Sequence, residues 1–134
     1  MPAFENPVVQ RHVIVSILGI DNNADATYTY TAPITGEVFI RSEECRLQIN
    51  RPTVCLFLLD ADASANGWTI SHISGKPDGV KPLPSEKGPY GLSLATYNDH
   101  SNHTETFNYY IHFFNTVTEA RFKEDPQEQN IPPR

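Results

Sequence analysis

Strict alternation of apolar and polar residues runs through much of this chain and restricts it to β-structure. Residues 26–31 (ATYTYT) alternate threonine with tyrosine, and residues 45–49 and 68–73 alternate in a similar way. Because successive side chains of a strand point to opposite faces, this pattern predicts strands with one buried face. Prolines occur throughout the chain, 11 in all, and they interrupt long helices.

Two other segments predict strands deeper in the core. Residues 53–59 (TVCLFLL) form a short continuous apolar run, which is typical of a central strand, and residues 12–18 are similar. Residues 104–115 predict the longest strand, with one face formed by Phe107, Tyr109, Ile111 and Phe113. With shorter candidates at 37–40, 92–97 and 121–122, the pattern predicts seven or eight strands and no helix.

The strand pattern predicts an all-β fold. We expect an antiparallel, immunoglobulin-like β-sandwich, with a closed barrel as the alternative. The 134 residues suit a single domain spanning 1–134. We expect residues 116–134 to form an extended C-terminal tail. Residues 74–91 carry four prolines and four glycines and are predicted to be an irregular connection.

The charge and hydropathy of the chain exclude several partners. The net charge of −6 argues against nucleic acid, because phosphate binding needs clustered lysine and arginine. No run approaches the ~18 apolar residues of a membrane-spanning helix. The first residues lack a basic segment followed by an apolar one, so the predicted compartment is the cytoplasm.

Cys45 and Cys55 are predicted to be buried free thiols. If residues 48–50 and 53–59 formed a hairpin, the two cysteines would be several residues out of register. If the two segments lie in different sheets, that argument does not apply. A reducing cytoplasm disfavours the disulfide in either case.

One loop has carboxylate and hydroxyl groups at alternate positions. Asp60, Asp62 and Ser64 resemble the start of a calcium loop, because a hard cation needs several oxygen ligands. However, the sixth and twelfth positions hold Ala65 and Ser71, where an EF-hand has glycine and glutamate. A simple strand connection is the alternative.

A second metal candidate lies in a polar turn. His100 and His103 are three residues apart and follow Asp99, and imidazole with carboxylate can bind zinc. No further strong ligand is evident nearby. An exposed loop is the alternative.

No motif for a catalytic nucleophile is present. The chain has no Gly-x-Ser-x-Gly, and neither cysteine has a histidine beside it. Ser71 and His72 are adjacent, but consecutive strand residues point to opposite faces, so we do not expect them to act as a pair. These observations favour a protein without enzymatic activity and predict no cofactor. An enzyme whose residues come together only on folding is left open.

Aromatic residues are numerous for a chain of this size. Tyrosine and tryptophan serve cores, subunit interfaces and sugar stacking alike. We expect core and oligomer contacts, with a carbohydrate platform as the alternative. The candidates are Tyr28, Tyr30, Trp68, Tyr90, Tyr97, Tyr109 and Tyr110.

The chain ends in a stiff segment, DPQEQNIPP, at residues 125–133. A proline holds the residue before it in an extended conformation, so the chain is predicted to run along the surface. Asp125, Pro126, Asn130 and Pro132 would then be available to cross a neighbouring subunit and extend a sheet edge.

This ending resembles that of the DP-EP family, small bacterial proteins named for an Asp-Pro and a following Glu-Pro. Here the second dipeptide is Ile131-Pro132. The likeness extends to Pro-x-x-Gly at 33–36 and Leu-Asp at 59–60. The resemblance implies a β-sandwich and no particular activity. The Asp-Pro ending is also similar to that of bacterial inclusion-body-forming proteins, which implies self-assembly.

Together these observations predict a non-enzymatic bacterial β-sandwich protein that acts by binding or self-association, as a homo-oligomer. A metal-ion-binding or carbohydrate-binding module is the alternative.

Overall fold

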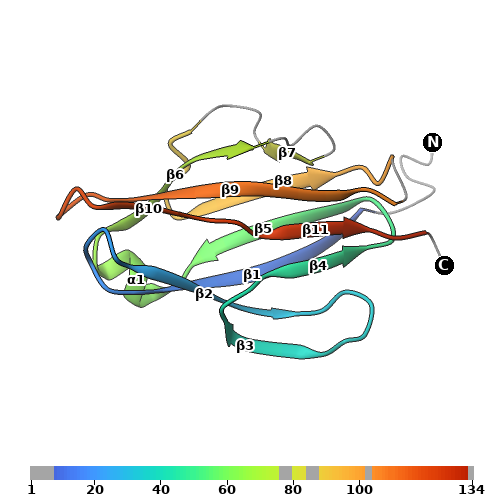
Figure 1. Cartoon of the computed structure of the whole chain (residues 1–134), viewed down its shortest axis with the longest axis horizontal. Helices are drawn as coiled ribbons and strands as arrows, with labels where there is room; N and C mark the ends of the chain where they lie inside the picture. Colours follow the sequence, from blue (N-terminus) through green and yellow to red (C-terminus); the bar gives the residue numbers. More distant parts are fainter. Residues whose placement is uncertain (1–7, 76–79, 84–87, 102–103, 133–134) are drawn as a thin grey trace.

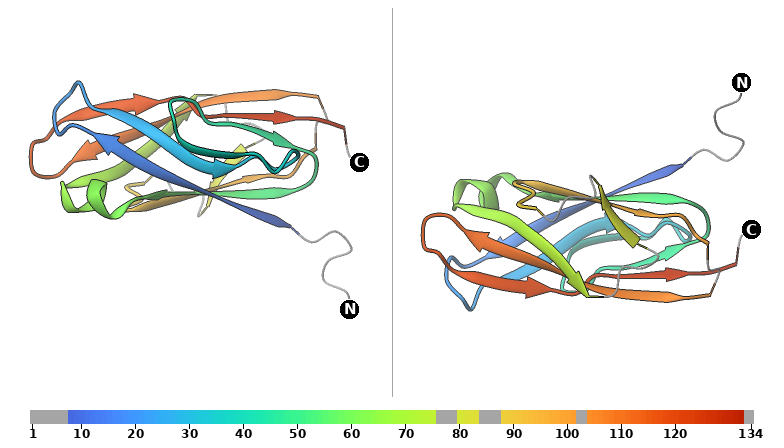
Figure 2. Two further views of the ribbon diagram at one scale, coloured as in Figure 1. Left: turned by 90° about the horizontal axis from the view of Figure 1, so that it is seen from below. Right: turned by 90° about the horizontal axis from the view of Figure 1, so that it is seen from above.

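A computed structural model describes residues 8–75, 80–83, 88–101 and 104–132. Within them the chain forms eleven strands and one short helix, arranged as two sheets packed face to face (Figure 1). Figure 2 shows the two layers from their sides, with the helix α1 (Ala61–Ala65) at one end. The predicted all-β sandwich is therefore confirmed, and the sheets do not close into a barrel.

The first sheet has six strands. They lie in the order β3 (Val38–Ser42), β2 (Asp25–Thr31), β1 (Val9–Leu18), β5 (Thr53–Leu59), β8 (Ser93–Asn98) and β7 (Val80–Leu83). The apolar run at 53–59 pairs with β1 on one side and β8 on the other, so it is central as predicted.

The second sheet is built around β9 (Thr106–Asn115). One edge of β9 pairs with β6 (Trp68–Gly75). The other edge pairs in a single register with β10 (Arg121–Glu124) and β11 (Gln127–Asn130), and β4 (Arg46–Ile49) follows beyond β11. In β9 the four predicted core residues Phe107, Tyr109, Ile111 and Phe113 are all buried.

Two strand pairs are parallel, so the sheets are mixed rather than antiparallel throughout. β1 pairs with β5, and β4 pairs with β11. Parallel neighbours need a crossover, and both are separated by long stretches of chain. Neither crossover could be recognised from strand patterns alone.

The C-terminal segment is part of the fold, which corrects the predicted surface tail. Residues 121–124 and 127–130 form β10 and β11, and β11 lies between β9 and β4. Pro126 is buried between them and has no N–H to donate, which interrupts the strand there. The segment predicted as an irregular connection likewise contains β7 at 80–83.

The two cysteines are free and buried, as predicted. β4 and β5 lie in different sheets, so the hairpin assumed for the register argument does not exist. Burial raises the pKa of both thiols well above the ordinary range, which keeps them protonated and unreactive. Among the described residues, no helix is long and apolar enough to cross a membrane.

Candidate functional site

The loop predicted to resemble a calcium site is a helical turn. Asp60 is the N-cap of α1, and its Oδ1 atom accepts a hydrogen bond of 2.8 Å from the backbone N–H of Ala63. Asp62 lies in the first turn, where a carboxylate favours the helix dipole. Asp60 therefore has a structural role as the cap of this helix.

Of the predicted histidine pair, His100 lies among the described residues. His100 is buried, and its Nε2 atom lies 2.6 Å from the carbonyl oxygen of Ile131. His103 lies outside the described residues. Across the part of the chain that is described, no group of three or more His, Cys, Asp or Glu side chains could hold a metal ion.

Two of the four residues predicted to reach a neighbouring subunit lie inside the sandwich. Pro126 and Asn130 are buried, and Asn130 Oδ1 accepts a hydrogen bond of 2.8 Å from Asn98 Nδ2. Asp125 and Pro132 are exposed. The tail therefore connects the two sheets of its own chain.

Most of the aromatic residues belong to the core. Tyr28, Tyr30, Trp68 and Tyr109 are buried, while Tyr90 and Tyr97 are half-buried. Tyr110 is the one exposed member of the seven, and the Lys123 Nζ atom lies 4.4 Å from its ring centre. A lone ring already covered by an ammonium group is a poor platform for a sugar.

Glu128 was not recognised as a core residue in the sequence, yet its side chain is fully buried between the sheets. Its Oε2 atom accepts hydrogen bonds from Tyr109 Oη at 2.6 Å and Thr96 Oγ1 at 3.3 Å. Its Oε1 atom accepts one from Asn98 Nδ2 at 3.3 Å. Burial raises the pKa of Glu128, and the hydrogen bonds from Tyr109 and Asn98 oppose that rise. This network connects the sheets and is closed to solvent.

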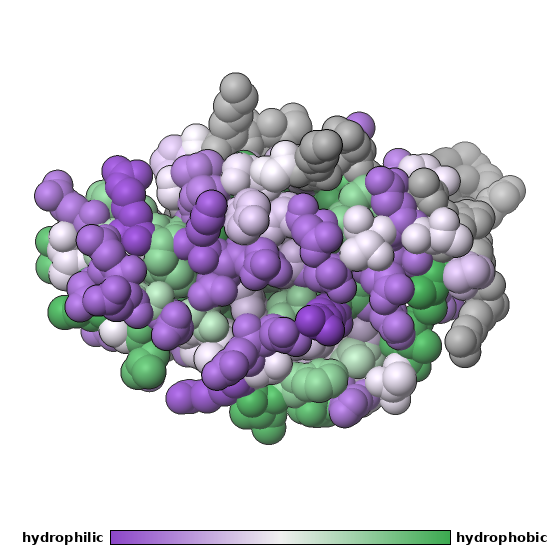
Figure 3. Space-filling view, in the orientation of Figure 1, coloured by the Kyte–Doolittle hydropathy of each residue, from purple (hydrophilic) through white to green (hydrophobic). Residues whose placement is uncertain are grey.

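One exposed apolar surface lies on β3, at the edge of the first sheet. Val38 is 61% exposed and Ile40 is 74% exposed, and alternation places both on the same face of the strand. We call these two residues the β3 ridge. Figure 3 shows apolar side chains gathered along the lower border of the molecule, where β3 lies in Figure 1. Such exposure on an unpaired edge is typical of an interaction surface.

Phe39, between the two ridge residues, points the opposite way. Its ring stacks on Tyr30 with centroids 5.0 Å apart, and it forms part of a groove of about 370 Å³. The groove runs between the turn that joins β2 to β3 and the β4–β11 pair of the second sheet. We call it the edge groove. Its apolar lining is Ala32, Pro33, Ile34, Phe39 and Leu47, and its polar lining is Thr35, Glu37, Arg46, Gln48, Gln127 and Gln129.

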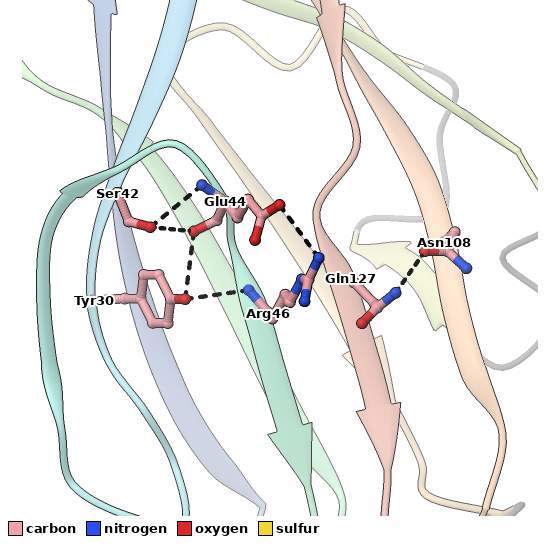
Figure 4. Close-up of polar contacts among 6 residues, drawn as sticks. All are labelled: Tyr30, Ser42, Glu44, Arg46, Asn108 and Gln127. Carbon is pink, nitrogen blue, oxygen red and sulfur yellow. Dashed lines mark hydrogen bonds and ion pairs between the residues drawn. The ribbon is translucent and has the colours of Figure 1, made fainter.

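A set of hydrogen bonds surrounds Arg46, one of the residues that line the edge groove (Figure 4). The Tyr30 hydroxyl accepts from the Arg46 backbone N–H at 3.2 Å and donates to the Glu44 carbonyl at 3.4 Å. The Arg46 guanidinium pairs with Glu44 at 3.2 Å, and both side chains are two-thirds exposed. The Tyr30 contacts join β2 of the first sheet to the start of β4 in the second sheet.

A bulge in β3 limits how its edge can be used. Arg41 has a φ of 51°, and the pairing with β2 shifts register between Tyr28 and Tyr30. The Arg41 N–H turns inward and donates to Thr29 Oγ1 at 3.0 Å. Since bulges interrupt strand pairing, this edge is unsuited to the open-ended addition of further strands.

A bulge in β6 overturns the expectation for Ser71 and His72. The pairing of β6 with β9 shifts register between Ile70 and His72, and the Ser71 Oγ atom lies 2.9 Å from His72 Nδ1. The two side chains therefore meet, although regular strand geometry would separate them. Nothing in the local sequence marks this bulge.

The sequence was also compared with known proteins. No family model matches it, and no curated protein matches it either.

Proposed function

We propose that this chain is a non-enzymatic protein that self-associates through the β3 ridge and the edge groove. The observation that carries the proposal is the position of an exposed apolar ridge directly beside a groove whose lining is partly apolar. Val38 and Ile40 project from the same strand whose Phe39 lines the groove.

A surface that carries both a ridge and a groove is complementary to itself. A two-fold rotation places the ridge of each copy against the groove of the other, which forms an isologous dimer. Because the β3 bulge blocks continued strand addition, this contact closes at two copies rather than growing into a fibre.

The charges around the edge groove permit such a contact despite the net charge of −6. Glu37 and Glu44 lie near Arg46, and the other polar groups of the lining are threonine and glutamine side chains. Each copy therefore presents both signs of charge and several uncharged hydrogen-bonding groups. Repulsion between like charges on the two copies therefore does not dominate this contact.

The resemblance to the DP-EP family and the bacterial origin it implies stay predictions. The cytoplasmic compartment is also part of the proposal, supported by two buried free thiols that a reducing environment would preserve.

The test is the mass of the purified protein in solution, measured by sedimentation equilibrium over a wide concentration range. We expect a mass of two chains that falls towards one chain on dilution. A one-chain mass at every concentration would count against self-association.

A further inference from the structure

The outer face of the second sheet carries a second group of polar side chains, far from the β3 ridge in the fold. His112 on β9 is the register partner of His72 on β6 and of Lys123 on β10. Three neighbouring strands thus place three nitrogen-bearing side chains in one row across the sheet.

The two imidazole rings are held in a defined arrangement. They stack with centroids 3.9 Å apart and an interplanar angle of 13°. Ser71 Oγ lies 2.9 Å from His72 Nδ1, and Ser74 Oγ lies 2.7 Å from His112 Nε2. Each serine fixes one nitrogen of a ring, so the second nitrogen of each ring is left to bind something else.

Two cations flank the histidines without a carboxylate partner among the described residues. The Arg121 guanidinium carbon lies 4.6 Å from the ring centre of Phe114, and Lys123 Nζ lies over Tyr110. A cation over an aromatic face keeps its N–H groups directed to the side, where they can donate. The one ion pair in the described part of the chain joins Arg46 to Glu44, at the other end of this sheet.

Together with Phe113 and Phe122, these residues line a hollow of about 170 Å³. Its polar lining is Ser71, His72, His112, Arg121 and Lys123, and no aspartate or glutamate contributes to it. The chain carries an excess of six negative charges, yet the polar groups that line this hollow are cations, imidazoles and a hydroxyl. Such a lining matches the charge and hydrogen-bonding needs of a tetrahedral oxyanion.

We propose that this hollow binds a phosphate group, with Arg121 and Lys123 supplying charge and Ser71, His72 and His112 supplying directed hydrogen bonds. The site is independent of the self-association surface.

A second, shallow hollow of about 590 Å³ adjoins the first. Ser71 and His72 line both, and Ile73, Gly88 and Pro89 complete the second. An organic group attached to the phosphate fits there, against Ile73 and Pro89. The ligand class is therefore a small phosphate monoester rather than free inorganic phosphate.

The affinity of this site for phosphate is predicted to depend on pH. In the empty protein the pKa of His112 is lowered, first by burial and then by the neighbouring His72 and Lys123. A bound dianion favours the imidazolium, so binding raises the pKa of His112. Binding should tighten as the pH falls towards the second pKa of the phosphate, about 6, below which loss of the dianion opposes it. The charged groups facing the ring are His72 from β6, with Arg121 and Lys123 from β10.

The experiment is a titration of the full chain followed by the NMR signals of the histidine Cε1–H groups, with calorimetry for affinity. The probes are inorganic phosphate, phenyl phosphate, sulfate and chloride. We expect phosphate to shift the His72 and His112 signals and to raise the pKa of His112, with phenyl phosphate binding more tightly. The double variant Arg121→Gln/Lys123→Gln should lose roughly tenfold or more in affinity.

A matched control removes two exposed cations elsewhere, in the variant Arg51→Gln/Lys81→Gln, and should leave affinity within about twofold. An equal loss in the control, or equal competition by chloride, would reduce the site to general charge attraction and overturn the proposal. Unmoved histidine signals with phosphate would overturn it as well. Phenyl phosphate binding no better than phosphate would overturn the part that assigns the second hollow.

Discussion

The Asn98 amide and the Glu128 carboxylate meet between the two sheets, with Nδ2 and Oε1 3.3 Å apart. Asn98 ends β8 of the first sheet, whereas Glu128 lies in β11 of the second, and both are fully buried. Tyr109 and Thr96 bond the other carboxylate oxygen. A polar network, and not apolar contact alone, thus positions the last strand.

Replacing Glu128 by leucine should destabilise the fold by about 2–4 kcal/mol, because Tyr109 and Asn98 lose the acceptor that satisfies them. Urea unfolding followed by circular dichroism measures the change. Thr106→Leu is the control, since Thr106 is exposed on the neighbouring strand β9 and lies outside the edge groove. Equal losses in the two variants would show that the network contributes nothing.

The pKa of Glu128 also predicts how stability depends on pH. Since its pKa is raised in the folded state, the native protein holds this proton more tightly than the unfolded chain. The resulting stabilisation is complete below the ordinary range of glutamate and is lost as the pH rises through the raised pKa.

Glu128→Gln cannot titrate, so its free energy of unfolding relative to the wild type should increase as the pH rises. Paired urea curves at acidic and mildly alkaline pH give this difference. The pKa of Glu124 is also raised, mainly by burial, but Glu124 is present in both proteins and cancels. A difference that is constant or reversed with pH contradicts the assignment.

Ending the chain at Glu124 should abolish cooperative unfolding, because it removes β11 from between β9 and β4. Ending it at Pro132 keeps β11 and the 2.9 Å bond from the Ile131 N–H to the Ile49 carbonyl, so that chain should fold. Thermal scans by circular dichroism distinguish the two. A folded, cooperative chain ending at Glu124 would mean that the segment is a dispensable tail after all.

Asp60→Ala should cost about 1 kcal/mol through loss of the N-cap, irrespective of calcium. Asp62→Ala, in the same turn, removes only an interaction with the helix dipole and should cost about half a kcal/mol or less. Thermal unfolding with and without calcium checks both. If calcium stabilised the wild type but neither variant, the loop would be a metal site instead.

Several strands could be predicted because their alternating apolar side chains are the ones that the structure buries. In β2, Tyr28 and Tyr30 are buried while the threonines beside them are less so, and β9 shows the same alternation over ten residues. Apart from Asn115 at the end of β9, the inward residues of both strands are aromatic or aliphatic, so the hydrophobic pattern predicts which face is buried.

β11 could not be predicted for the opposite reason. Its sequence is QEQN, and its inward residues are Glu128 and Asn130, which are buried only because partners on β8 and β9 satisfy them. Those partners are about twenty to thirty residues away in sequence. Polar residues next to proline therefore suggested an exposed tail.

The candidate surfaces were missed because they depend on tertiary placement. Val38 and Ile40 look like ordinary strand residues, and only the position of β3 at a sheet edge exposes them. The Ser71–His72 contact depends on a bulge, which is set by pairing with β9 rather than by local residue preference.

The most direct test of self-association is the solution mass of the variant Val38→Lys/Ile40→Lys, compared with the variant Leu18→Lys/Val117→Lys. Leu18 and Val117 are 80% and 78% exposed and lie away from β3, so the control matches the number, chemistry and charge of the changes. Circular dichroism confirms that both variants are folded. Sedimentation equilibrium should give one chain for the β3 variant and two for the control. Two chains for both variants would contradict the assignment of the interface to the β3 ridge.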